Sequence, residues 1–120
     1  MNINNALAEL KQRPGFADNV GMVLIHNGVV RSWSRKDHKN VTSINIRQDK
    51  EKIRAICEEM EKKPGIFAIA WEALEGDFKP GDDILFLIVA GDIRENVKAT
   101  FSELLERIKS EGVTKQEYYI

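Results

Sequence analysis

The hydrophobic positions of the chain follow two spacings, one typical of helices and one typical of strands. Between residues 49 and 63, apolar residues recur at intervals of three and four: Ile53, Ile56, Cys57 and Met60. This spacing places them on one face of an amphipathic helix, and charged residues occupy the other faces. Pro64 and Gly65 follow, and both residue types favour the end of a helix. The pattern therefore predicts a helix over about 49–63.

A second amphipathic helix is predicted over about 93–110. Its apolar stripe consists of Val97, Phe101, Leu104, Leu105 and Ile108. Asp92 and Glu95 have the spacing of a helix N-cap and third helical residue, so we expect Asp92 to cap this helix. A short N-terminal helix is predicted from the helical spacing of three apolar residues, with Asn4 or Asn5 as its cap and Pro14-Gly15 at its end: Ala6, Leu7 and Leu10.

Runs of β-branched and other apolar residues predict the strands. They lie at 21–25, 41–46, 66–71 and 84–90, and the tail from 113 onward forms a last strand or an ordered arm. Asn27-Gly28 forms either a hairpin turn or a bulge within one longer first strand. Segment 72–83 contains Gly76, Pro80 and Gly81, which are typical of tight turns. We therefore expect an α+β fold with a mainly antiparallel sheet.

Length and composition limit the classes of protein to which this chain can belong. A chain of 120 residues with 42% hydrophobic residues is sufficient for one domain, here 1–120, without disulfides. Its 18 basic and 19 acidic residues give a net charge of −1, so no overall field favours nucleic acid or membrane. The longest apolar run, 84–90, is too short to span a bilayer. With one cysteine and no secretory leader pattern, we expect a cytoplasmic protein.

Several kinds of chemistry are not expected from the residues present. Cys57 lies on the apolar face of its helix, where a thiol has a raised pKa and little access to substrates. His26 and His38 have no further histidine or cysteine at ligand spacing, so we expect no metal site. The phosphate-binding, dinucleotide-binding and serine-hydrolase motifs are missing, and we expect no cofactor.

Five basic residues stand near the ends of predicted elements, where side chains can face a cleft: Arg31, Arg35, Arg94, Lys109 and Lys115. Arg94 lies at a helix N-terminus, where free backbone N–H groups and the helix dipole favour anions. An arginine at this position either strengthens a phosphate site or pairs with Asp92 or Glu95. The residues alone leave both interpretations open.

Three segments, in their order and spacing, resemble the catalytic large subunit of molybdopterin synthase. They are GMVLIHNGVVR at 21–31, GDFKPGDDILFLIVAGDIR at 76–94, and a lysine at 109 followed by KQE at 115–117. The resemblance covers about residues 16–117 and is weakest between Ile46 and Ile66. It implies an α/β hammerhead fold and a homodimer that binds a small ubiquitin-like sulfur carrier at each end, which makes a heterotetramer.

The resemblance also implies an activity and roles for individual residues. The carrier's C-terminal Gly-Gly thiocarboxylate would enter a pocket of the large subunit, and two sulfurs would pass to cyclic pyranopterin monophosphate to form a dithiolene. Arg31 and Arg94 would hold the substrate phosphate or the carrier carboxylate, with Arg35 nearby. Lys109 and Lys115 would stabilise developing charge or shuttle protons. A cluster of cations would lower their pKa toward neutrality.

The chain departs from the family pattern at three places. Ile93 stands where the family has a histidine, so a polar anchor or proton shuttle is expected to be lost there. His26 stands where the family has an aromatic residue, and its ring is expected to compensate if it reaches the same cleft. The family pattern continues past the position of Ile120 with a segment that supplies an arginine to the neighbouring site, and we expect that arginine to be missing.

Two other functions compete with the catalytic one. A non-catalytic member of the family would keep the carrier-binding surface and serve as an interaction module. A single-stranded nucleic-acid binder would use Trp33 and the basic segment 31–39, since an aromatic ring among cations can stack with bases. The acidic isoelectric point of about 6.1 and the single aromatic residue of this segment favour the other two, so no nucleic-acid partner is expected.

Overall fold

The computed structural model describes the backbone of residues 1–119 and the side chains of residues 1–115. Its elements, in chain order, are α1 (Ile3–Lys11), α2 (Phe16–Asn19), β1 (Met22–Val29), β2 (Val41–Gln48), α3 (Lys50–Glu61), β3 (Ile66–Ala73), β4 (Gly76–Phe78), β5 (Asp83–Gly91), α4 (Arg94–Arg107), the π-helical turn η1 (Ile108–Gly112) and β6 (Val113–Tyr119). The predicted α+β class is confirmed, with antiparallel strand pairs, two long helices and a short N-terminal helix.

The first sheet has the strand order β1-β5-β3, with the most hydrophobic strand in the centre. Successive side chains of a strand point to opposite faces, and both faces of β5 are covered. Leu87 and Val89 belong to the main hydrophobic core, whereas Ile88 and Ala90 belong to a smaller cluster with Leu10 of α1. A continuous apolar run such as 84–90 is the pattern expected of a strand buried on both sides.

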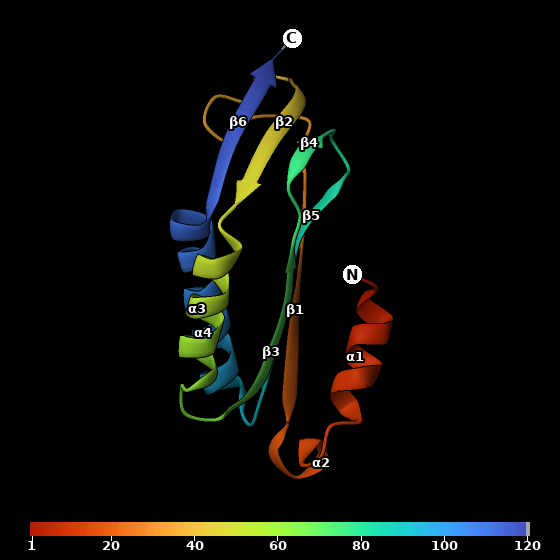
Figure 1. Cartoon of the computed structure of the whole chain (residues 1–120), viewed down its shortest axis with the longest axis vertical. Helices are drawn as coiled ribbons and strands as arrows, with labels where there is room; N and C mark the ends of the chain where they lie inside the picture. Colours follow the sequence, from red (N-terminus) through yellow and green to blue (C-terminus); the bar gives the residue numbers. More distant parts are fainter. Residues whose placement is uncertain (120) are drawn as a thin grey trace.

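Helices α3 and α4 cover one face of this sheet and α1 covers the other (Figure 1). The apolar stripe predicted for α3 is confirmed, because all four of its residues are buried: Ile53, Ile56, Cys57 and Met60. In α4 the buried residues are Val97, Thr100 and Leu104. Within the described residues, every helix is too short or too polar to cross a membrane.

The second sheet has the order β4-β2-β6 and lies at one end of the first (Figure 1). Ile44 and Ile46 of β2 are buried in the main core, so the two sheets share one hydrophobic interior. This end-to-end arrangement makes the molecule elongated, with extents of 51 × 25 × 25 Å. The junction between the sheets therefore brings together the ends of β1, β2 and β5 and the start of β6.

The structure corrects two predicted helix caps. The N-cap of helix α4 is Ile93, whose apolar side chain forms no capping bond, and the Asp92 carboxylate accepts hydrogen bonds from the Ile93 N–H and the Asn96 side chain. Helix α1 is capped by Asn2, whose side chain accepts a hydrogen bond from the Asn5 N–H at 3.0 Å, and not by Asn4 or Asn5.

The structure contains three elements that the sequence did not predict, and it shows which conformation Asn27-Gly28 adopts. The short helix α2, strand β4 and the π-helical turn η1 occur where turns or a continuous helix were expected. Asn27 and Gly28 lie inside one long strand, β1, with a register shift between Gly28 and Val29. The bulge interpretation is therefore confirmed and the hairpin interpretation is wrong.

Candidate functional site

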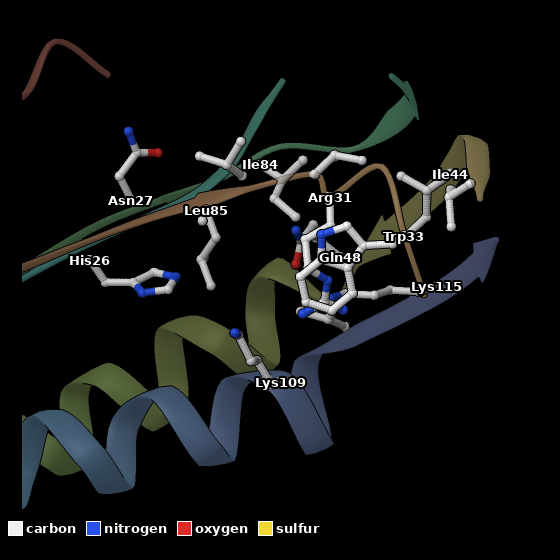
Figure 2. A pocket seen from close by; sticks show the side chains of 15 residues that line it. His26, Asn27, Arg31, Trp33, Ile44, Gln48, Ile84, Leu85, Lys109 and Lys115 are labelled. Atoms are coloured by element: carbon white, nitrogen blue, oxygen red, sulfur yellow. The ribbon is translucent and has the colours of Figure 1, made fainter. Parts of the chain in front are cut away.

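A cavity of about 290 Å³ lies at the junction of the two sheets. Strand β1 and the residues after it form one wall, β2 and β5 contribute apolar side chains, and η1 and β6 contribute two lysines (Figure 2). Among its lining residues are four of the basic and histidine side chains singled out in the sequence: His26, Arg31, Lys109 and Lys115. Residues up to 89 positions apart in the sequence thus meet in one place.

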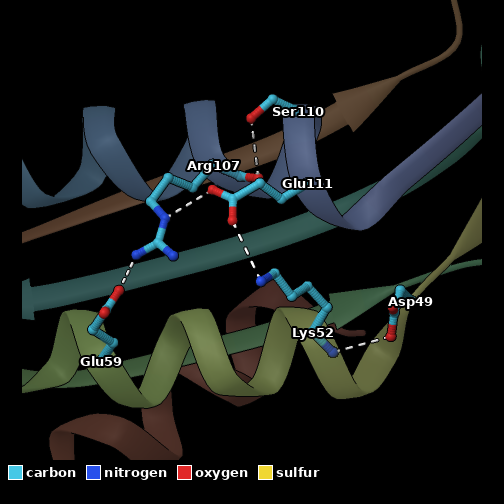
Figure 3. Close-up of polar contacts among 6 residues, drawn as sticks. All are labelled: Asp49, Lys52, Glu59, Arg107, Ser110 and Glu111. Carbon is cyan, nitrogen blue, oxygen red and sulfur yellow. Dashed lines mark hydrogen bonds and ion pairs between the residues drawn. The ribbon is translucent and has the colours of Figure 1, made fainter.

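The position of Lys109 depends on the π-helical turn η1 that ends α4 and on its contacts with α3 (Figure 3). Arg107 forms ion pairs with Glu59 of α3 and with Glu111, and Glu111 also pairs with Lys52 of α3 at 3.6 Å. The Arg107 guanidinium donates to the Glu111 carboxylate at 2.9 Å and lowers the pKa of that carboxyl. These pairs hold both sides of Lys109 against α3.

Close backbone packing holds η1 in the same place. The Asp49 N–H donates to the carbonyl of Gly112 at 2.8 Å, which joins the start of α3 to the end of η1. A Cβ atom on Gly112 would lie 2.7 Å from Cγ1 of Ile53, a residue with no exposed surface. Glycine is therefore required at this contact because α3 and η1 approach more closely than a side chain allows.

Lys109 has an electrostatic environment suited to acid–base chemistry. Burial lowers the pKa of its ammonium group below the ordinary lysine value, and the positive charges of Arg31 and Arg35 lower it further. Figure 2 shows its side chain rising from the helix end toward the wall that carries His26. The sequence predicts such a shift from clustered cations; in the structure burial is the larger cause, and the contributing cations are two arginines.

His26 on β1 is the second titratable group in the cavity. Burial lowers the pKa of its imidazole, and the charge of Lys109 lowers it further, so the ring is neutral at pH 7. Its Nε2 atom is buried and has no hydrogen-bond partner among the described residues. Gly28 leaves room for this atom, since a Cβ there would lie 3.0 Å from it. The ring therefore presents a free polar atom inside the cavity wall.

The segment between β1 and β2 contributes an aromatic side chain to the wall of the cavity. Trp33 and Asn40 form an isolated antiparallel bridge, and the Val41 N–H donates to the Ser32 carbonyl at 2.9 Å. The Arg31 guanidinium carbon lies 4.9 Å from the centre of the Trp33 ring, and the His38 ring stacks on Trp33 at 5.0 Å. These contacts hold the Arg31 charge at the cavity.

Comparisons with known proteins give a consistent result. The family model described as MoaE protein matches residues 2–111. The chain belongs to the MoaE family. The resemblance to the large subunit of molybdopterin synthase is thereby confirmed, and the chain has a large-subunit role in molybdenum cofactor biosynthesis. Comparison with curated proteins gives no match.

Solved structures share the fold at low sequence identity. Molybdopterin synthase from Staphylococcus aureus is 20% identical, with a TM-score of 0.71, and 84% of this chain and 76% of that chain are covered. Molybdopterin cofactor biosynthesis protein E from Burkholderia multivorans ATCC 17616 is 20% identical, with a TM-score of 0.75 and coverage of 100% and 84%. A complex of subunits 1 and 2 of molybdopterin-converting factor from Helicobacter pylori 26695 gives 16% identity, a TM-score of 0.70 and coverage of 99% and 80%.

The structure separates the candidate residues of this MoaE-family chain into three positions. His26, Arg31, Lys109 and Lys115 line the cavity. Arg35 lies in an adjoining open groove of about 520 Å³ that Lys109 also borders. Arg94 lies elsewhere, at the opposite end of α4, where its side chain is 78% exposed and pairs with Glu95 at 3.6 Å. Within one chain, Arg94 is therefore not part of the group that lines the cavity.

One cavity residue of this MoaE-family chain was not recognised in the sequence. Gln48, the last residue of β2, is 9% exposed and lines the cavity, and its Oε1 has no hydrogen-bond partner among the described residues. A glutamine at the end of a predicted strand is usually solvated, so the hydrophobic pattern of the sequence does not indicate that Gln48 is buried. Only the packing of β2 against distant segments shows that it is buried.

Proposed function

We propose that this chain transfers sulfur from the C-terminal thiocarboxylate of a small ubiquitin-like carrier to cyclic pyranopterin monophosphate. The observation that supports this function is the cavity in which Lys109, with a lowered pKa, lies beside Arg31 and the neutral His26. Cations attract the anionic tail and the substrate phosphate, and a lysine whose pKa is lowered can accept and return protons. Lys115, on the same wall, adds charge that stabilises the developing anion.

The carrier is proposed to be the small subunit of molybdopterin synthase with a C-terminal Gly-Gly. A complex of two molybdopterin-converting factor subunits from Helicobacter pylori has a chain of this fold. A diglycine tail is narrow enough for a cavity of about 290 Å³, because glycine has no side chain. We also propose that the protein acts in the cytoplasm, where a buried, unpaired thiol such as Cys57 remains reduced.

The test is a calorimetric titration with the small subunit from the same organism, with and without its terminal Gly-Gly. We expect tight binding of the intact form and a large loss of affinity for the truncated form. Equal affinity would exclude insertion of the tail. Incubation of the thiocarboxylated form with the pterin substrate should then yield the dithiolene product. Tail-dependent binding without product would instead support the interaction module, for which the replacement of the family's histidine by Ile93 is the favouring observation.

Nucleic-acid binding has less support from the structure. The Trp33 ring already contacts Arg31 and His38, so a base that stacked on it would compete with those contacts. We therefore retain sulfur transfer as the proposed function.

We further propose that the protein is a homodimer in which one subunit brings its Arg94 to the cavity of the other. Helix α4 and the turn η1, at about 1.5 Å per residue, separate Arg94 from Lys109 by roughly 22 Å, too far for one small substrate to contact both. Ile93, beside Arg94, is 53% exposed, and Ile25 and Val29 are exposed on the edge strand β1. A second copy that covered these apolar side chains would complete both sites by symmetry.

Subunit exchange between two inactive variants tests this arrangement. A mixture of Arg94→Ala and Lys109→Ala proteins should form mixed dimers with one intact site each. Random pairing then restores about a quarter of the wild-type activity. No recovery in mixed dimers verified by mass spectrometry would mean that each chain acts alone.

A further inference from the structure

The Gln48 side chain is held so that its oxygen, and not its nitrogen, faces the cavity. Its Nε2 donates a hydrogen bond to the carbonyl of Leu74 at 3.0 Å, and a carbonyl can only accept. This contact fixes the orientation of the amide, which leaves Oε1 buried and without a partner among the described residues. Figure 2 shows that oxygen in the cavity, on the side from which Lys109 enters.

A buried acceptor without a partner indicates the chemistry of the ligand. Leaving a buried carbonyl oxygen unsatisfied costs about 1–3 kcal/mol, so such atoms usually receive a hydrogen bond from water or from a bound molecule. Apolar side chains form the wall between the polar groups: Val30, Val41, Ile44, Ile84, Leu85 and Val113. A ligand that satisfies Gln48 therefore presents a hydrogen-bond donor there, such as an N–H group, and an anionic group to Arg31 and Lys109.

A peptide tail meets these requirements better than a pterin ring does. A C-terminal diglycine offers an anion at its end and amide N–H groups a few atoms earlier, with no side chains to exclude. A pterin ring carries donors and acceptors around its whole edge, and the apolar parts of the wall would leave some of them unsatisfied. The cations at the cavity are available to both, whereas the single acceptor of Gln48 suits the tail.

We propose that Gln48 is a positioning residue that accepts a hydrogen bond from a glycine N–H of the inserted tail. This inference rests on the proposed function, because it assumes that a carrier tail enters the cavity. The bond fixes the depth of the tail, so that its terminal thiocarboxylate lies beside Lys109.

The test combines one change in the tail with one change in the protein. The small subunit from the same organism is prepared by semisynthesis with either glycine amide of its carboxylate tail replaced by an ester, which removes the N–H without adding bulk. On the wild-type protein, we expect the ester at one of the two positions to raise the Kd by roughly five- to tenfold. In Gln48→Met, amide and ester tails should bind within about twofold of each other.

A matched variant separates this role from a general effect on folding. Asn45→Met changes an amide on the same strand that pairs with Asp77 and does not line the cavity. It should keep the discrimination between amide and ester. A purely structural role for Gln48 would weaken both tails equally and leave their ratio unchanged in Gln48→Met, which would overturn the proposal.

The outcomes also distinguish this inference from the proposed function. If the small subunit binds without regard to its Gly-Gly, both fail. If binding requires the tail but neither ester is discriminated by the wild-type protein, sulfur-carrier binding stands and the role of Gln48 is rejected. If Gln48→Met weakens binding of the pterin substrate but not of the tail, Gln48 faces the pterin and the proposal is wrong.

Discussion

Helix α4 begins with one basic residue, Arg94, and the turn η1 that follows it carries another, Lys109, in different surroundings. At the N-terminal end, Arg94 is largely exposed and pairs with its neighbour Glu95. The adjacent Asp92 carboxylate accepts hydrogen bonds from the Asn96 side chain and from the Ile93 N–H. Both bonds lower the pKa of this carboxyl, and the bond from Asn96 has the larger effect. At the C-terminal end, Lys109 borders a cavity built from four other segments, and its own pKa is lowered.

The difference shows that a helix terminus alone does not make a site. Both positions carry a cation, yet only Lys109 lies at a cavity that other elements form. Partial burial at the cavity and the positive charges of Arg31 and Arg35 lower the pKa of Lys109, although its side chain remains partly open to solvent. Any function of the exposed end within the same reaction must come from a second molecule, which is the basis of the proposed dimer.

The largest expected effect is the loss of sulfur transfer in Lys109→Ala. A positioned catalytic cation contributes roughly two to four orders of magnitude in rate, so the variant should lose activity on that scale in a single-turnover assay. Its fold should remain intact, because Lys109 is outside the hydrophobic core. Circular dichroism and thermal unfolding check this second point.

The matched control for this prediction is Lys98→Ala. Lys98 is an exposed lysine on the same helix and borders no cavity described above. Its replacement should leave the rate within a few-fold of wild type. If Lys109→Ala also stays in that range, the contrast between the two ends of α4 has no catalytic meaning.

An intermediate effect is expected in Gly112→Ala, which tests how η1 positions Lys109. The new Cβ would lie 2.7 Å from Cγ1 of Ile53, and Ile53 is fully buried and cannot move aside easily. Overpacking of this kind costs about 1–3 kcal/mol in the free energy of unfolding, measured by urea denaturation. Activity should fall as well, because η1 and Lys109 must shift together. Ser110→Ala, at an exposed position two residues earlier, should change stability by less than about 0.5 kcal/mol.

The sequence predicts elements well where one face or both faces of a segment are buried. The stripe of α3 and the double burial of β5 follow directly from periodicity and from a continuous apolar run. It fails where local groups have several possible partners. Asp92 has the spacing of a cap, but the neighbouring Ile93 N–H and Asn96 amide compete for its carboxylate. Strand β4 is only three residues long and exists because β2 lies beside it.

The same reasoning applies to the candidate site. His26 and Arg31 are close in the sequence, but nothing local predicts that Lys109 packs near them or that its burial outweighs the effect of neighbouring charges. The sequence does not predict a role for Gln48, because its hydrogen-bond partner Leu74 lies in a distant segment, as do the cavity walls around it. The sequence does not distinguish Arg94 from Lys109, because a position near the end of a helix is a local property. Whether that position lies at a cavity depends on distant segments.

The smallest expected effect is a change in the pKa of His26, and it tests the contrast most directly. Burial is the larger cause of the lowered His26 pKa and the Lys109 charge is the second. Lys109→Met removes the charge and keeps an apolar chain of similar length. The His26 pKa should therefore rise without fully recovering its ordinary value. NMR titration can follow this, because the chain has only two histidines.

The corresponding change at the other end, Arg94→Met, should leave the His26 titration unchanged in the monomer.

The direction of the His26 pKa shift can also be checked through the pH dependence of stability. Between the ordinary histidine pKa of 6.5 and the lower folded value, the unfolded chain binds a proton at His26 and the folded chain does not. Stability should thus fall as the pH falls below about 6.5, and less steeply in Lys109→Met. An unchanged His26 titration in Lys109→Met would mean that Lys109 does not act on the cavity, and its resemblance to Arg94 would then be complete.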